Sequence, residues 1–174
     1  VQERLNRGEK GAHQYDHTRR VYALAMKIGA RMGANLRVLG AAALLHDVGR
    51  PLEQKTGISH AILSGDMSRE LLRTIGYTED EIDQVVRAIR THRFSEHLEP
   101  DTLEGQILSD ADKLDAIGAI GVFRAIAEAA VTGRDIEGFL RHADEKLLRL
   151  AGMLHTDVAR QIAEERHRVL SAFV

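Results

Sequence analysis

The chain has 174 residues, of which 44% are hydrophobic and 29% are charged, and its formal net charge is −2. This size and composition predict one globular domain over residues 1–174, and the near-neutral charge gives no reason to expect a nucleic-acid-binding surface. We expect neither a transmembrane helix nor a signal peptide, because no apolar stretch has the required length or setting. The absence of cysteine excludes disulfides and thiolate metal ligands, and it is typical of a cytoplasmic protein.

The spacing of apolar residues predicts an all-α protein, a single-domain helical bundle of about seven helices. No segment shows the apolar–polar alternation of a β-strand, and no repeat or linker divides the chain. Loops are expected at residues 1–12, 49–58 and 92–101. The predicted helices cover about residues 16–32, 36–47, 59–75, 78–91, 103–131, 136–150 and 156–172, and the fifth of them is long or bent because Gly118 and Gly121 interrupt it.

One predicted helix, over residues 36–47, is apolar on every side, which is typical of a buried helix. It ends in His46 and Asp47, and Gly49 and Pro51 then stop it. An imidazole and an ionised carboxylate that are buried there need partners. They could pair with each other, or they could share a metal ion, since both are good ligands for divalent metals. The dipeptide alone leaves both interpretations open.

Three further histidines lie at the ends of apolar stripes on other predicted helices: His17 precedes one stripe, His60 begins another, and His92 ends a third. Burial of one such ring as an ordinary core residue is common, but burial at the ends of four separate helices by coincidence is not. We therefore expect His17, His46, His60 and His92 to converge on one pocket. The other histidines are expected at the surface (His142, His155 and His167) or in or near loops (His13 and His97).

Three aspartates, Asp110, Asp112 and Asp115, lie close to the apolar face of the helix predicted over residues 103–131. Three carboxylates cannot all be buried there without a cation. Helical angles alone place Asp115 closest to the apolar stripe. One or two of the three are equally well explained as surface charges.

Several of these motifs resemble those of the HD-domain metal-dependent phosphohydrolase superfamily, and in particular its small stand-alone members. His17, then His46-Asp47, then an aspartate in an Ala-Asp-Lys-Leu setting follow the His…His-Asp…Asp order of that superfamily. The similar stretches are residues 15–22, 42–47 and 110–121, and the resemblance covers about residues 12–130. It implies an HD-domain fold.

The resemblance also implies a divalent metal ion, and it favours Asp112 over Asp115 as the last ligand. Oxygen and imidazole ligands suit Mn²⁺, Fe²⁺, Mg²⁺ or Co²⁺. The implied metal ligands are His17, His46, Asp47 and Asp112.

Two more histidines, His60 and His92, match positions at which larger HD proteins place ligands of a second metal or contacts to phosphate. Those proteins often carry two adjacent histidines, whereas Thr91 precedes His92 here. This departure from the pattern argues against a full two-metal site.

The implied reaction is hydrolysis of a phosphoester or phosphoanhydride bond, in a nucleotide or a small phosphorylated metabolite, by a metal-activated water. Asp47 could also orient this water, and His60 and His92 are further candidate catalytic residues. Arg20 shares a helix face with His17 and could neutralise phosphate charge, although a role on the helix surface explains it equally well. Further candidates for phosphate contacts are Arg50 and Lys113.

Two other functions remain open from the sequence. Some HD-fold proteins use a di-iron centre for oxygenation, which needs about six protein ligands. A non-catalytic metal- or nucleotide-binding signalling module is the other, and it ranks lower because the His46-Asp47 pair is intact.

Overall fold

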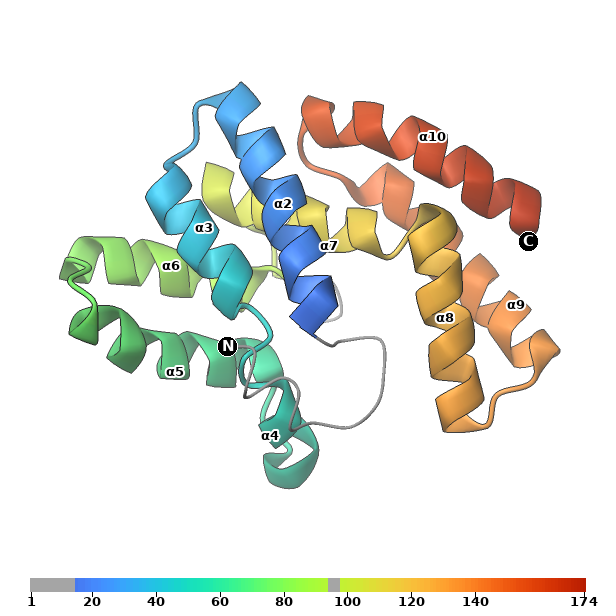
Figure 1. Ribbon diagram of the computed structural model, residues 1–174, viewed down its shortest axis with the longest axis horizontal. Helices are drawn as coiled ribbons and strands as arrows, with labels where there is room; N and C mark the ends of the chain where they lie inside the picture. Colours follow the sequence, from blue (N-terminus) through green and yellow to red (C-terminus); the bar gives the residue numbers. More distant parts are fainter. Residues whose placement is uncertain (1–14, 94–97) are drawn as a thin grey trace.

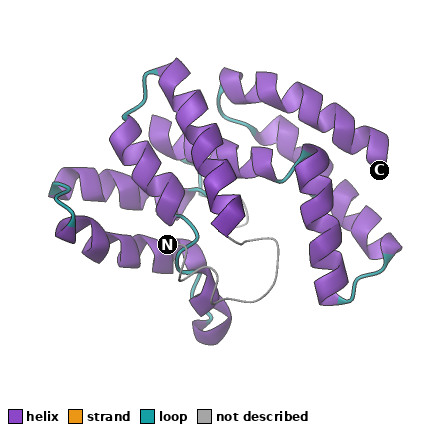
Figure 2. Cartoon of the chain, viewed as in Figure 1, coloured by secondary structure: helices purple, strands orange, loops and turns teal. Residues whose placement is uncertain are grey.

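The computed structural model describes residues 15–93 and 98–174. In these residues it has nine α-helices, one 3₁₀-helix and no strand, so the predicted all-α class is confirmed (Figures 1 and 2). None of the described helices is both long and apolar enough to cross a membrane. The helices are α2 (Tyr15–Met32), α3 (Leu36–Leu45), α4 (Arg50–Thr56), α5 (His60–Thr74), α6 (Glu79–Thr91), α7 (Leu103–Asp115), α8 (Gly118–Thr132), α9 (Ile136–Glu145), η2 (Leu147–Met153) and α10 (Asp157–Phe173).

Helix α3 is the central buried helix that the apolar composition predicts. It packs against α2, α6 and α7, and all of its residues from Val38 to Ala43 are buried. The side chain of Asn35 begins the helix by accepting hydrogen bonds from two backbone N–H groups of the first turn. Because α3 points into the protein, His46 and Asp47 at its C-terminal end are held in the interior.

Helices α5 and α6 pack along each other on one side of α3 (Figure 1). Helix α6 begins with a capping box, in which the side chains of Thr78 and Glu81 satisfy each other's backbone N–H groups. His92 is the residue that caps its other end. The start of α5 and the end of α6 therefore bring His60 and His92 toward the end of α3.

The C-terminal helices are joined to this core through α10, which packs against α7, α8 and η2. Asp110 on α7 fixes the start of α10. Its carboxylate accepts hydrogen bonds from the backbone N–H groups of His155 and Thr156, both at 2.8 Å, and from the Thr156 hydroxyl at 2.7 Å. One of the three clustered aspartates thus has a structural partner that explains its burial.

The prediction of a loop over residues 49–58 is wrong, because helix α4 occupies most of this segment. Pro51 lies in the first turn of α4, where a missing N–H is harmless and the fixed φ of proline suits a helix. Gly57 closes the helix with φ of 68°. The proline therefore begins a new helix where it was expected only to end the preceding one.

The long helix expected over residues 103–131 is two helices, α7 and α8, with a break at Ala116 and Ile117. Gly118 has φ of +75°, which a residue with a side chain rarely adopts. A Cβ atom on Gly121 would lie 2.2 Å from the carbonyl oxygen of Ala116. The two glycines thus permit a change of direction, and it turns α8 away from the end of α7 (Figure 1).

Candidate metal centre

The four histidines predicted to converge lie together in the interior. His17 is in the first turn of α2, His46 follows α3, and both are at most 1% exposed. His60 begins α5 and His92 follows α6, and they are at most 2% exposed. The ring centroids of His17 and His46 are 5.4 Å apart, those of His46 and His92 are 5.1 Å apart, and those of His60 and His92 are 5.5 Å apart. The helix ends therefore form one cluster, as the sequence predicts.

In all four rings Nδ1 faces away from the centre toward an oxygen that accepts a hydrogen bond. For His46 this oxygen is the Ala43 carbonyl at 2.9 Å, and for His92 it is the Ile89 carbonyl at 2.5 Å. A carbonyl oxygen can only accept, so Nδ1 of each ring carries the proton.

The other two rings bond to carboxylates in the same way. Nδ1 of His17 lies 2.7 Å from Oδ2 of Asp115, and Nδ1 of His60 lies 3.0 Å from Oε2 of Glu53. Guanidinium groups also bond to both carboxylates, so these remain ionised and accept from Nδ1. The Nε2 atom is consequently the one that each of the four rings can offer to a metal ion, with its outer nitrogen fixed by a hydrogen bond.

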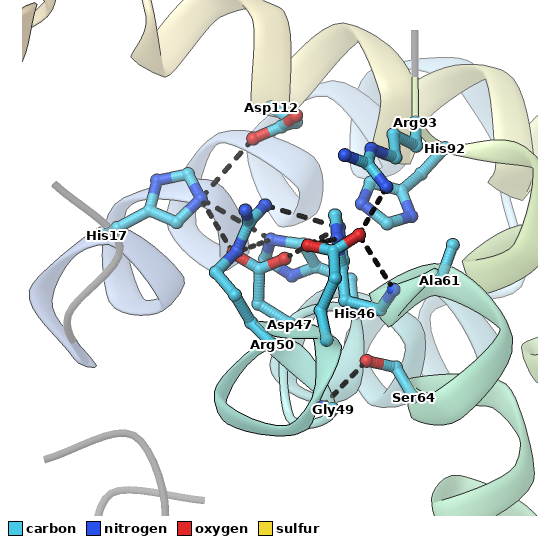
Figure 3. A network of polar contacts seen from close by, with 12 residues as sticks. His17, His46, Asp47, Gly49, Arg50, Ala61, Ser64, His92, Arg93 and Asp112 are labelled. Atoms are coloured by element: carbon cyan, nitrogen blue, oxygen red, sulfur yellow. Dashed lines mark hydrogen bonds and ion pairs between the residues drawn. The ribbon is translucent and has the colours of Figure 1, made fainter. Parts of the chain in front are cut away.

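Three electron-rich atoms lie close to Nε2 of His17. Nε2 of His46 is 3.4 Å away, Oδ1 of Asp112 is 3.3 Å away, and Oδ2 of Asp47 is 3.7 Å away (Figure 3). Such a set is stable only with a positive charge among it, which a proton or a metal ion can supply. Two groups have ligand atoms that lie within 4.8 Å of one another and can hold a metal ion: His17 with His46 and Asp112, and His46 with Asp47 and His92.

The structure separates the two candidate aspartates of α7. Asp112 lies on the Nε2 side of His17 and its side chain is 32% exposed. Asp115 lies on the Nδ1 side, is 1% exposed, and accepts hydrogen bonds from Arg20 at 2.7 and 3.0 Å and from Arg124 at 2.7 Å. Helical angles thus predicted the burial of Asp115 correctly, but the less buried Asp112 is the one that faces the other candidate ligands.

The electrostatics of the cluster favour neutral imidazoles beside ionised carboxylates. Burial lowers the pKa of His46 to about 4. Burial and the charge of Arg50 lower the pKa of His60 to about 4. Neutral imidazole is the form that binds metal ions, so these two rings need no deprotonation near pH 7.

His17 and Asp112 behave differently because they face each other. Burial by itself lowers the pKa of His17, but its hydrogen bonds to Asp112 and Asp115 outweigh burial and raise it. Burial by itself raises the pKa of Asp112, but the hydrogen bond and charge of His17 hold it well below its usual range. The imidazole of His17 and the carboxylate of Asp112 therefore stabilise each other's charged forms.

A cavity of about 220 Å³ opens beside the cluster toward α8, α9 and η2. His60, His92 and Asp112 line its inner end. His142, which was expected at the surface, is half-buried and lines its outer part, and His155 and His167 are also half-buried. His13 and His97 lie outside the described residues. The cationic side chains that line the cavity are Arg50, Arg93, Lys113, Arg124 and Lys146.

The three predicted phosphate contacts differ in their surroundings. Lys113 is 6% exposed, and its ammonium group donates to the Ser109 hydroxyl at 2.5 Å. Arg50 donates to Asp47 at 3.0 Å. Arg20 directs Nε and Nη2 at Asp115, behind His17.

Sequence reasoning missed Glu53, Arg93 and Arg124. Arg93 follows His92 directly, and this adjacency was an available signal. Glu53 and Arg124 belong to parts of the chain where the elements were predicted wrongly, so their position near the histidines could not be inferred.

A model of the HD domain matches residues 15–117, which include all the histidines and aspartates of the cluster. The chain belongs to the HD-domain family. It is 34% identical over 174 residues to YpgQ of Bacillus subtilis, which covers 95% of this chain and 83% of YpgQ.

Solved structures agree with this assignment. A crystal structure of Bacillus subtilis YpgQ in complex with ADP superposes with a TM-score of 0.80 at 35% identity, covering 95% of this chain and 87% of that chain. An HD-superfamily hydrolase from Bacillus thuringiensis superposes with a TM-score of 0.73 at 31% identity, covering 91% and 80% of the two chains. Ribonuclease Y of Rubrobacter xylanophilus is 31% identical over 110 residues, which are 63% of this chain and only 20% of that enzyme.

Proposed function

We propose that this protein is a metal-dependent phosphohydrolase that cleaves a phosphoester or phosphoanhydride bond of a nucleotide or small phosphorylated metabolite. The observation that supports it most directly is the orientation of four buried imidazoles, each with Nδ1 held by an acceptor and Nε2 on the side of the centre. Histidines that served only to pack the core would not require all four rings to share this orientation. Membership of a family that includes hydrolases supports the same class of reaction.

The metal ion would be held by His17, His46, Asp47 and Asp112. Nitrogen and carboxylate donors without sulfur suit Mn²⁺, Fe²⁺, Mg²⁺ or Co²⁺. When bound, such an ion lowers the pKa of a coordinated water and polarises a phosphoryl oxygen.

The protein's own groups would then orient the reactants. Asp47 is 1% exposed and held by Arg50, so its carboxylate is fixed in place to orient the attacking water. His60 and His92 line the cavity at its inner end, where we propose that they contact the phosphoryl group and its leaving oxygen. The bond between His60 and Glu53 fixes Nδ1 of His60 and would keep Nε2 directed at the substrate.

The substrate would lie in the cavity that extends toward α8 and α9. Its cationic lining suits an anionic substrate, and Arg50 and Lys113, which both line it, are the proposed phosphate contacts. Arg20 ranks after them because two of its donors already bond to Asp115. That YpgQ was crystallised with ADP supports a nucleotide over other phosphorylated metabolites.

A substrate screen with added Mn²⁺ tests this function. Purified protein would be incubated with nucleoside mono-, di- and triphosphates and with a generic phosphoester, and the release of phosphate and pyrophosphate would be measured. We expect turnover that disappears on chelation and returns with Mn²⁺. The Asp144→Asn variant is a matched control because Asp144 is exposed on α9. Absence of turnover with every metal and substrate would count against a phosphohydrolase.

Di-iron oxygenation is a second candidate, because the two groups of potential metal ligands together with His60 comprise six inward-facing side chains. It predicts oxygen uptake by the Fe²⁺-loaded protein and no need for a phosphorylated substrate. Oxygen-electrode measurements run beside the phosphatase screen distinguish the two reactions.

A further inference from the structure

The candidate ligands of the centre form two neighbouring groups, and Asp47 lies between them. Its Oδ2 atom is 3.7 Å from Nε2 of both His17 and His46, whereas its Oδ1 atom is 3.2 Å from Nε2 of His60. One carboxylate could therefore serve two ions, one on the His17 side and one on the side of His60 and His92. Whether a second ion binds depends on what else occupies that second side.

The guanidinium of Arg50 already lies between the two sides, against Asp47 and His60. Its Nε atom donates to Oδ2 of Asp47 at 3.0 Å, and its Nη2 atom is 3.2 Å from Nε2 of His60 (Figure 3). Because Nδ1 of His60 carries the proton that bonds to Glu53, Nε2 of His60 presents its lone pair to Arg50 and accepts the hydrogen bond. Arg50 thus bonds to two of the groups that a second ion would need.

The backbone holds Arg50 in this position. Arg50 is the first residue of α4, and its N–H donates to the Asp47 carbonyl at 3.0 Å. The N–H of Gly49 donates to the Ser64 hydroxyl at 2.9 Å, which ties the turn between them to α5. The side chain is only 29% exposed, so the site itself determines where the guanidinium lies.

We propose that the guanidinium of Arg50 is the second cation of this centre, so that the protein binds one divalent metal ion where its ligands could hold two. A guanidinium does not lose its proton in a protein, so Arg50 can neither ligate an ion nor become neutral to admit one. One divalent ion and one guanidinium already bring three positive charges against the two carboxylates of Asp47 and Asp112. A second divalent ion would leave a large uncompensated positive charge in a buried site.

This inference rests on the proposed metal-dependent function and specifies its metal content. Arg50 also lines the cavity, so the same charge faces the phosphoryl group that a second ion would otherwise neutralise. Its role differs from that of a second metal because a guanidinium cannot activate a water molecule.

Metal stoichiometry tests the proposal without relying on activity. Wild-type protein and the variants Arg50→Met, Arg50→Lys and Arg73→Met would be loaded with Mn²⁺, dialysed, and measured for Mn²⁺ per chain. The electron paramagnetic resonance spectrum would show whether the ions are isolated or spin-coupled. Arg50→Met keeps the length of the side chain without its charge, and Arg50→Lys keeps the charge. Arg73 is the matched control because it forms an exposed ion pair with Glu79.

We expect one uncoupled Mn²⁺ in the wild-type protein and in Arg50→Lys and Arg73→Met, and two coupled Mn²⁺ ions in Arg50→Met. Two coupled ions in the wild-type protein would overturn the role of Arg50 and leave the metal-dependent function standing. A single ion in folded Arg50→Met would also overturn it, since the ligands alone would then limit the count. Wild-type protein that binds no Mn²⁺ would overturn both proposals.

Discussion

Nδ1 of His17 donates a hydrogen bond of 2.7 Å to Oδ2 of Asp115, a carboxylate that two arginines also hold. The carboxylate stays ionised because Arg20 and Arg124 donate to it, and burial does not reverse this: the pKa of Asp115 is lowered. The pair therefore fixes both the tautomer and the orientation of His17. Groups that support a metal ligand in this way commonly affect metal affinity without touching the ion.

We expect the Asp115→Asn variant to bind Mn²⁺ about 10- to 100-fold more weakly, which is the usual effect of removing such a supporting group. The amide keeps the shape of the side chain but cannot hold His17 in one tautomer. Isothermal titration calorimetry with Mn²⁺ measures the change.

The comparison with Asp112→Asn tests which aspartate is the ligand. We expect the larger loss of affinity for Asp112→Asn, because Oδ1 of Asp112 faces Nε2 of His17. If Asp112→Asn bound Mn²⁺ normally and Asp115→Asn did not, the assignment of these two residues would be reversed.

A bound metal ion should also stabilise the fold. The groups that it would satisfy come from α2, α7 and the end of α3, and a ligand at about 100 times its dissociation constant adds roughly 2.7 kcal/mol to the free energy of unfolding. Thermal unfolding followed by circular dichroism, with Mn²⁺ and after chelation, measures this shift. An unchanged melting temperature in protein shown to be metal-loaded would mean that the ion is not bound by the folded cluster.

The sequence predicts the inner part of this site well because buried side chains recur along a helix with the helical period. Helical spacing placed His17, His60 and His92 at the ends of core-facing stripes, and the composition of the central helix placed His46 inside. These are local signals, and the convergence of the four rings follows once each stripe must face the same core.

The outer part of the site could not be predicted in the same way. Arg124 and His142 line the cavity only because the chain turns at Ala116 and Ile117 and brings α8 and α9 over its opening. Glycines within an apolar pattern indicate a bend without giving its angle. The partners of Asp110, which lie 45 and 46 residues further along the chain, likewise depend on tertiary packing that leaves no local pattern.

Gly49 offers a test of the turn that follows the His-Asp pair. The φ of Gly49 is −87°, which suits any residue. Close packing around this position, rather than its backbone conformation, is therefore what requires glycine. A Cβ atom there would lie 2.7 Å from both the Leu63 Cβ and the Ser64 backbone nitrogen. We expect Gly49→Ala to lower the free energy of unfolding by about 1–3 kcal/mol, as overpacking does.

Chemical denaturation of the metal-free protein measures this effect. Gly152→Ala is the control, since a Cβ atom there meets nothing within 4 Å, and its effect should stay within about 0.5 kcal/mol. Equal stability of the two variants would show that α5 can move away from the turn.

The last prediction concerns Asp47, whose carboxylate lies within 3.7 Å of Nε2 of three histidines of the centre. Its Oδ1 atom is 3.2 Å from Nε2 of His60, and its Oδ2 atom accepts from Arg50 at 3.0 Å. Asp47 follows the last turn of α3, so its side chain does not contribute to the apolar packing of that helix. We therefore expect Asp47→Ala to remain helical and folded.

Turnover should nevertheless fall by at least about 100-fold, because the change removes a proposed metal ligand and misplaces the attacking water. It also releases Arg50 from the carboxylate that positions it. The measurement is turnover of nucleotide and generic phosphoester substrates at saturating Mn²⁺, with circular dichroism to confirm the fold. Asp115→Ala should reduce turnover less, since Asp115 acts through His17. Near-normal turnover by folded Asp47→Ala would exclude a mechanism in which this carboxylate binds the metal ion and orients the water.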